Sequence, residues 1–314
     1  MNQSVEHHWW PVGLQRYWED ENGYVTWLDP KGELHQKKRK KRKVGYLKHG
    51  HTFLRGTAFE SNFEDEFSSA DNSVHRVVKQ LIAFPVQEEV PSSVAAHRTF
   101  GRSKWSEEIR AGGAVSHITE DLLRDTTLLI LSLLIRSPGS RALLEGYARL
   151  AGQPPNEDVG KLNMSSRFKL AKKACEWKVA PSFCFALIRS EQQRFIVGDG
   201  YYDQLSASAM GGSLRGTALV PLTPSLCVYM FSPWSYTSDE NCIAFEAEAD
   251  LIDAINRISQ IYSGGVLYFA GGAPEITDDF RRGEFLEIAQ TSIPFLEAIE
   301  GTLASPRPLF SPFF

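Results

Sequence analysis

The chain has few cysteines, and they are not spaced as metal ligands usually are. Its 314 residues include four cysteines, at positions 175, 184, 227 and 242, and no pair has CxxC or CxxH spacing. Three of them lie in apolar runs, which favours buried reduced thiols over a zinc site or a disulfide framework. We therefore expect a reducing compartment and a cytoplasmic protein.

Long apolar runs are also absent. The longest strongly apolar stretch, residues 128–135, is far shorter than the roughly 20 residues that a membrane-spanning helix needs. Met1 leads directly into polar and aromatic residues, so we expect no signal peptide and no membrane partner.

The sequence contains none of the common catalytic motifs. It has no GxSxG, HExxH or phosphate-loop pattern, and its Gly-Gly pairs at 112–113, 211–212, 264–265 and 271–272 lack the context of a phosphate loop. Motifs alone therefore do not assign a reaction.

Positive charge is concentrated in one place. The net charge is −4, yet seven consecutive cations occur in an otherwise acidic chain: Lys37, Lys38, Arg39, Lys40, Lys41, Arg42 and Lys43. Such a run attracts phosphates through counterion release, which predicts a nucleic-acid-binding segment. A solvated surface strand and a targeting signal remain alternatives.

The N-terminal region is rich in tryptophan and turn signals. Four of the seven Trp lie in the first 27 residues, and burying such large apolar side chains is favourable, so we expect this region to pack against the body. Residues 23–29 alternate like a strand, Asp29-Pro30-Lys31-Gly32 has turn composition, and residues 33–36 would return as the partner strand.

The remaining pattern predicts a single α+β domain over residues 1–314. Apolar periodicity indicates helices within 59–82, 119–135, 140–150 and 165–177, and later within 247–262 and 285–300. Short apolar runs at 183–188, 193–197, 218–222, 226–231 and 266–270 indicate strands. Residues 84–117 lack a period and read as a long surface segment.

We therefore expect a helical N-terminal half packed on a mostly antiparallel sheet from the C-terminal half. Its parts would be 1–58 with the hairpin and basic run, 59–180 with the helices, and 181–314 with the sheet and two helices.

Several segments, in order, resemble one bacterial family. They are the box His7-His8-Trp9-Trp10-Pro11 with Arg16 and Trp18, then Val44-Gly45-Tyr46, Phe59–Glu64, Arg136-Ser137-Pro138 with Arg141, Phe195–Gly200 and Pro221-Leu222-Thr223-Pro224. Together they resemble the family catalogued as domain of unknown function 4238. The resemblance implies a shared fold and gives no activity, because the family has none established. Gly198, Gly200 and Tyr201 depart from its Ser-Asp-Asn-Pro segment.

Three residues are candidate catalytic groups. The family box favours His8 over His7, and a histidine titrates near neutrality, so His8 can move a proton. Arg16 can neutralise a phosphate or carboxylate. Asp199, between two glycines, can orient His8 or hold a metal such as Mg²⁺, with Asp203 as a weaker second carboxylate.

Each candidate also has an ordinary structural interpretation. His8 can cap a helix or hydrogen-bond in an aromatic cluster, Arg16 can form a salt bridge, and Asp199 can stabilise a turn. Arg136 and Arg141 form a candidate anion-binding pair, although a cation at a helix C-terminus is favourable by itself.

These observations support two hypotheses. The first is a nucleic-acid- or nucleotide-directed enzyme that hydrolyses phosphodiesters, such as a bacterial toxin or phage-defence effector. The second is a non-catalytic module that binds nucleic acid or a partner protein through the basic run.

Overall fold

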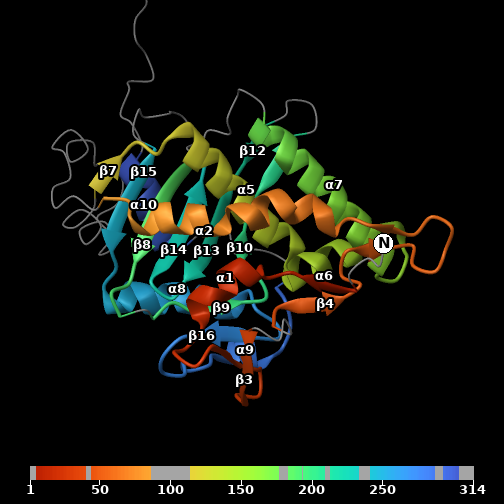
Figure 1. Cartoon of the computed structure of the whole chain (residues 1–314), viewed down its shortest axis with the longest axis horizontal. Coiled ribbons are helices and arrows are strands. Elements are labelled where there is room, and N and C mark those ends of the chain that lie inside the picture. Colours follow the sequence, from red (N-terminus) through yellow and green to blue (C-terminus); the bar gives the residue numbers. More distant parts are fainter. Residues whose placement is uncertain are drawn as a thin grey trace, which may run out of the picture.

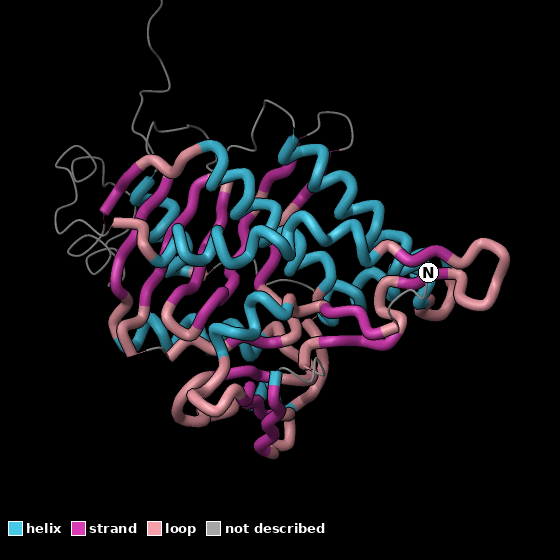
Figure 2. Tube along the Cα trace, in the orientation of Figure 1, coloured by secondary structure: helices cyan, strands magenta, loops and turns pink. Residues whose placement is uncertain are grey.

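The structure is a computed structural model that describes residues 5–39, 44–85, 114–176, 183–192, 194–208, 213–232, 241–286 and 293–303. Its centre is a six-stranded sheet with helices on both faces, and a smaller sheet lies at one end (Figures 1 and 2).

The six-stranded sheet has the order β10 (Tyr202–Asp203), β13 (Thr217–Thr223), β14 (Leu226–Phe231), β8 (Cys184–Arg189), β15 (Cys242–Glu246) and β7 (Ala114–Ser116). Neighbouring strands are antiparallel except β15 and β8, which are parallel. Strands β14 and β8 are almost wholly buried. Their continuous apolar runs reflect this, because both faces of the sheet are covered.

Alternation along these strands supplies two hydrophobic cores. In β8, Phe185 and Leu187 face one core while Ala186 and Ile188 face the other. The first core includes side chains of α2 (Ser68–Ile82), α5 (Glu120–Arg136) and α7 (Glu157–Glu176). The second includes side chains of α8 (Ala249–Ile261) and α10 (Pro294–Leu303). The period-two pattern of a strand thus produces a three-layer arrangement.

The smaller sheet joins segments that are distant in the sequence. Its order is β3 (Leu34–Lys38), β2 (Tyr24–Leu28), β16 (Leu267–Phe269) and β9 (Val197–Gly198), all antiparallel. The short helix α9 (Asp278–Arg281) contributes Phe280 to the small apolar cluster here. The N-terminal hairpin therefore has a C-terminal strand as its partner.

Short elements build the region that carries the candidate site. Strand β1 (Glu6–His8) pairs with β4 (Tyr46–Lys48), and β5 (Thr52–Phe53) pairs with β6 (Ser61–Asn62). Strands β11 (Ser206–Ser208) and β12 (Ser213–Arg215) form another pair. The remaining elements are α1 (Val12–Gln15), η1 (Arg16–Trp18), η3 (Glu64–Phe67), α6 (Pro138–Gly146) and η4 (Tyr147–Ala151).

The expected division into a helical first half and a sheet-forming second half is wrong. The chain is α+β, but the described residues up to Asn62 already contain β1 to β6, and β7 joins the central sheet from within the segment expected to be surface. Helices α8 and α10 lie in the second half. Long-range strand pairing, as between Leu28 and Leu267, mixes the two halves, and local periodicity carries no record of such pairing.

Several local predictions are confirmed. The hairpin turns at residues 29–32, where the Asp29 side chain accepts hydrogen bonds from the backbone N–H groups of Lys31 and Glu33. Thr119 caps α5. Trp9, Trp10 and Trp18 are buried, and all four cysteines are buried thiols. Strand β15 was missed because its short apolar run follows a polar segment.

No single helix in the described part of the chain is long and apolar enough to cross a membrane. The consecutive helical segments Glu120–Arg136 and Pro138–Ala151 are together long and apolar enough to do so, but the chain bends by 58° between them.

Candidate functional site

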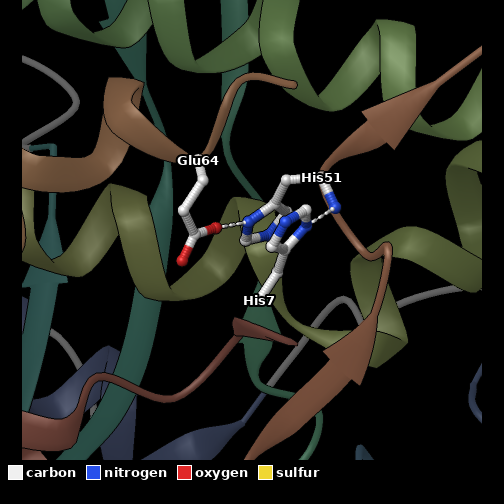
Figure 3. A group of neighbouring side chains, drawn as sticks. All are labelled: His7, His51 and Glu64. Carbon is white, nitrogen blue, oxygen red and sulfur yellow. Dashed lines mark hydrogen bonds and ion pairs between the residues drawn. The ribbon is translucent and has the colours of Figure 1, made fainter. Parts of the chain in front are cut away.

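Two histidines and a glutamate meet beside the first core, and we call them the histidine centre. His7 comes from β1, His51 from the turn before β5 and Glu64 from the start of η3. Their nitrogen and oxygen ligand atoms lie within 4.8 Å of one another (Figure 3). His51 Nδ1 is hydrogen-bonded to a Glu64 carboxylate oxygen. Three short elements therefore converge on one buried polar cluster.

His7 links this cluster to the main chain. The backbone N–H of His51 donates to His7 Nδ1 at 2.7 Å, and the side-chain amide nitrogen of Asn62 lies 3.2 Å from His7 Nε2. The His7 and His51 rings stack with centroids 5.2 Å apart. These contacts fix the backbone of the turn 49–51 against β1.

Burial sets the protonation of the centre. Burial lowers the pKa of His51, although the hydrogen bond that His51 donates to the Glu64 carboxylate opposes this shift. Burial alone would raise the pKa of Glu64, but the interactions with His51 outweigh it and the pKa falls below its usual value. The pair is therefore a neutral imidazole beside an ionised carboxylate at neutral pH.

The residue types suit a transition metal, but their arrangement does not. Two imidazoles and a carboxylate are a familiar donor set. The two rings, however, are within 10° of parallel, so their in-plane lone pairs do not converge on one ion at about 2.0–2.1 Å. His7 Nδ1 also already accepts the His51 N–H. As it stands, the centre is a hydrogen-bonded brace for the turn.

A second feature, which we call the basic pocket, opens on the same turn. It has a volume of about 450 Å³ and is lined by Val5, Lys48, His49, Arg55, Glu157, Asp158 and Lys161. Three lysine and arginine side chains face two carboxylates, and Asp158 is engaged in accepting the N–H of Leu54 at 2.8 Å. The balance of charge favours an anionic ligand.

His49 holds an unusual backbone conformation at the pocket wall. Its φ is +54°, in the left-handed region that few residues other than glycine adopt. Residues held in this region cluster at functional sites. Partial desolvation and the guanidinium of Arg55 lower the pKa of His49. A neutral imidazole that can accept a proton therefore faces the pocket at neutral pH.

Lys161 gives the pocket a buried charge. Its side chain is only 4% exposed, and its Nζ lies 2.6 Å from Glu157 Oε1. The same oxygen lies 2.6 Å from Nη2 of Arg141. Two cationic donors thus converge on one carboxylate oxygen.

The three candidate catalytic residues have different neighbours. His8 lies at the end of β1 beside the Tyr46 ring, and its backbone carbonyl accepts a hydrogen bond from Arg136 at 3.3 Å. Arg16 is exposed, with its guanidinium 6.0 Å from the centre of the Tyr17 ring. The structure brings His8 together with Arg136, and a catalytic cluster of His8, Arg16 and Asp199 stays a prediction.

Asp199 stabilises the fold of its neighbourhood. Its Oδ1 accepts the backbone N–H groups of Gly264 at 3.0 Å and Gly265 at 3.2 Å. Burial raises the pKa of Asp199 to about 6, against the opposing effect of these hydrogen bonds. The flanking Gly200 allows close approach of the chain at Tyr262, because a Cβ there would overlap a backbone carbonyl. Asp199 therefore has a structural role, as one interpretation of the sequence suggested, but these two hydrogen bonds join distant segments rather than residues of its own turn.

The remaining candidates are paired with carboxylates. Arg136 is buried and ion-paired with Asp71, and its guanidinium lies 5.0 Å from the centre of the Phe67 ring. Arg141 pairs with Glu145 and Glu157. A shared anion site of Arg136 and Arg141 stays a prediction.

Part of the basic run lies in the hairpin. Lys37 and Lys38 are in β3, with the Lys38 ammonium 5.1 Å from the centre of the Tyr24 ring. Arg39 is ion-paired with Glu19. The other members, Lys40, Lys41, Arg42 and Lys43, lie outside the described residues.

Sequence reasoning missed the histidine centre and the basic pocket. The sequence favours His8 over His7, whereas the buried member of the pair is His7. The spacing His49-Gly50-His51, just after β4, was the available local signal. Nothing local connects this segment with Lys161, which lies in α7.

The family resemblance also stays a prediction, since it rests on the quoted segments alone. A search of protein-family models, of curated proteins and of solved structures found no match to this chain.

Proposed function

We propose that this protein hydrolyses a phosphate ester of a nucleotide or nucleic acid, and that the basic pocket binds the phosphate. The observation that carries the proposal is the convergence of Lys48, Arg55 and the buried Lys161 on one pocket beside His49. Cations that surround a phosphate neutralise the charge that develops as the ester bond breaks.

The proposed reaction needs a proton acceptor next to the phosphate. His49 accepts the proton of an attacking water, whose oxygen forms the new bond to phosphorus. The phosphorus–oxygen bond to the leaving alcohol breaks, and that alcohol takes a proton from solvent. Lys161 and Arg55 hold the phosphate oxygens.

The histidine centre has an indirect part in this proposal. His51 is two residues from His49, and its backbone N–H is held by His7. His7, His51 and Glu64 therefore act as positioning residues for the turn that presents His49. A toxin or phage-defence setting belongs to the same proposal.

The test is incubation of the purified protein with end-labelled RNA and DNA, with and without Mg²⁺, on native and denaturing gels. The variants are His49→Asn, which tolerates a positive φ but loses the base, and Lys161→Met, which keeps most of the side-chain volume. His35→Asn is the matched control, because His35 lies in the hairpin and pairs with Asp29.

We expect cleavage by the wild type and by His35→Asn, with at least a 100-fold loss in His49→Asn, the usual size of a general-base contribution. A mobility shift without cleavage, lost in Lys161→Met, would replace hydrolysis by the non-catalytic binding function. Cleavage that survives in both pocket variants would move the active site elsewhere.

A further inference from the structure

Glu157 places a carboxylate between two cations at the basic pocket. It is the first residue of α7, and its Oε1 lies 2.6 Å from both Lys161 Nζ and Arg141 Nη2. The two cations come from different helices, Arg141 from α6 and Lys161 from α7. The two donors therefore form a small anion-binding subsite that bridges two helices.

The three side chains differ greatly in exposure. Lys161 is 4% exposed and Arg141 is 16% exposed, whereas Glu157 is 56% exposed. A buried ammonium is costly unless an anion lies beside it. The anion that now serves Lys161 belongs to a side chain that can turn toward solvent by rotating its own bonds, without movement of the helix.

Arg141 would keep part of its neutralisation if Glu157 left. Its Nε donates to Glu145 Oε1 at 2.6 Å, so one carboxylate remains on the guanidinium. Lys161, in contrast, is ion-paired with Glu157 and lines the pocket. A departing Glu157 thus exposes a buried positive charge to whatever fills the pocket.

We propose that Arg141 and Lys161 form a phosphate-binding subsite, and that Glu157 occupies it in the unliganded protein until a phosphate displaces the carboxylate. A phosphate oxygen makes the same charge-assisted hydrogen bonds to ammonium and guanidinium groups as a carboxylate oxygen does. The interactions with Lys161 and then Arg141 lower the pKa of Glu157, so the internal competitor is an anion at neutral pH.

This inference rests on the proposed function for the identity of the pocket, and it adds the ligand that the subsite selects. A phosphomonoester ends in a negatively charged phosphate, which can take the place of the Glu157 carboxylate beside the two cations. The exposed carboxylate of Glu157 and the half-buried carboxylate of Asp158, both in the pocket lining, also disfavour a second phosphate beside the first. The subsite therefore fits a terminal phosphate, as in a nucleoside monophosphate.

The experiment is isothermal titration of inorganic phosphate and of adenosine 5′-monophosphate into the full chain and its Glu157→Gln variant. Glu145→Gln is the matched control, because it removes the same charge from the carboxylate that pairs with Nε of Arg141. Circular dichroism checks that each variant is folded, and Glu157→Asp replaces Glu157→Gln if the latter is not.

We expect Glu157→Gln to bind both ligands about 2- to 5-fold more tightly than the wild type, the range for removing one partly exposed ion pair. Glu145→Gln should change the affinity less than twofold.

The two proposals fail differently. Equal affinities in wild type and Glu157→Gln, or weaker binding in the variant, would overturn the displacement of Glu157 and leave the phosphate pocket standing. Absence of binding to either ligand in all folded variants would overturn both. A rise in affinity of equal size in Glu145→Gln would reduce the effect to net charge and overturn the subsite.

Discussion

At the scale of single residues, the same type of side chain can stabilise the fold or serve a site, and its neighbours in the structure show which role it has. Asp199 looked catalytic because it follows a strand and lies between glycines. Its partners are the backbone N–H groups of Gly264 and Gly265, so its described contacts stabilise a loop. His49 had no such prominence in the sequence, yet it lines the basic pocket with a positive φ.

Burial of Asp199 has a consequence for stability against pH. Its pKa in the folded protein is about 6, above the value near 4 of an unfolded chain. The folded state therefore binds the proton more tightly, and the stabilisation is complete below pH 4 and is lost as the pH rises through 6. At about 1.4 kcal/mol per pKa unit, the loss is on the order of 2–3 kcal/mol.

We predict that Asp199→Asn removes this slope. The amide oxygen can still accept the two N–H groups and does not titrate. The free energy of unfolding of the variant should therefore increase relative to that of the wild type as the pH rises from 4 to 6. Urea unfolding at several pH values measures it. Asp278→Asn, at a carboxylate that is 99% exposed, should keep the wild-type slope, and identical slopes in all three proteins would contradict the prediction.

At the scale of elements, Arg136 holds three segments together. It is the last residue of α5, pairs with Asp71 of α2 and donates to the carbonyl of His8 in β1. From the sequence alone, the favourable interaction of a cation with the C-terminus of a helix is enough to account for Arg136. Burial of the guanidinium makes the Asp71 pair the more important interaction.

Replacing Asp71 by Asn should therefore be destabilising. The change leaves a buried guanidinium without its counter-charge, and we expect a loss of roughly 2 kcal/mol, reduced from the value for a fully buried pair because Asp71 is one third exposed. Chemical denaturation measures the loss. Asp121→Asn, whose partner Arg124 is exposed, should cost less than about 0.5 kcal/mol, and equal losses would refute the role of Arg136.

At the scale of the whole molecule, the two central strands of the six-stranded sheet are shielded from solvent on every side. Strands β8 and β14 are buried on both faces and paired along both edges. Strand β3 lies at the edge of the smaller sheet and alternates between exposed and half-buried positions.

Hydrogen exchange should reflect this difference. We predict that backbone N–H groups of β8 and β14 exchange only through global unfolding, whereas those of β3 exchange through local opening and at least 100-fold faster. Mass spectrometry of peptides from both strands measures the rates. Equal protection of β3 and β14 would mean that the smaller sheet unfolds with the larger one.

Sequence reasoning reached the features that are encoded locally. The turn at Asp29–Gly32, the cap at Thr119 and the apolar run 226–231 each signal their structure within a few residues. The pairing of Leu28 with Leu267 and the meeting of His49 with Lys161 depend on contacts between distant segments. One sequence alone shows no trace of them, so neither the topology nor the pocket was predicted.

The pairing of β2 with β16 also has a meaning for biosynthesis. Roughly 240 residues separate Leu28 from Leu267, and a ribosome needs on the order of 10–50 s to translate that length. During this interval the hairpin has left the ribosome without the strand that completes its sheet. Trp27 lacks its contact with Tyr268 of the late strand until then, so the smaller sheet is completed only near the end of synthesis.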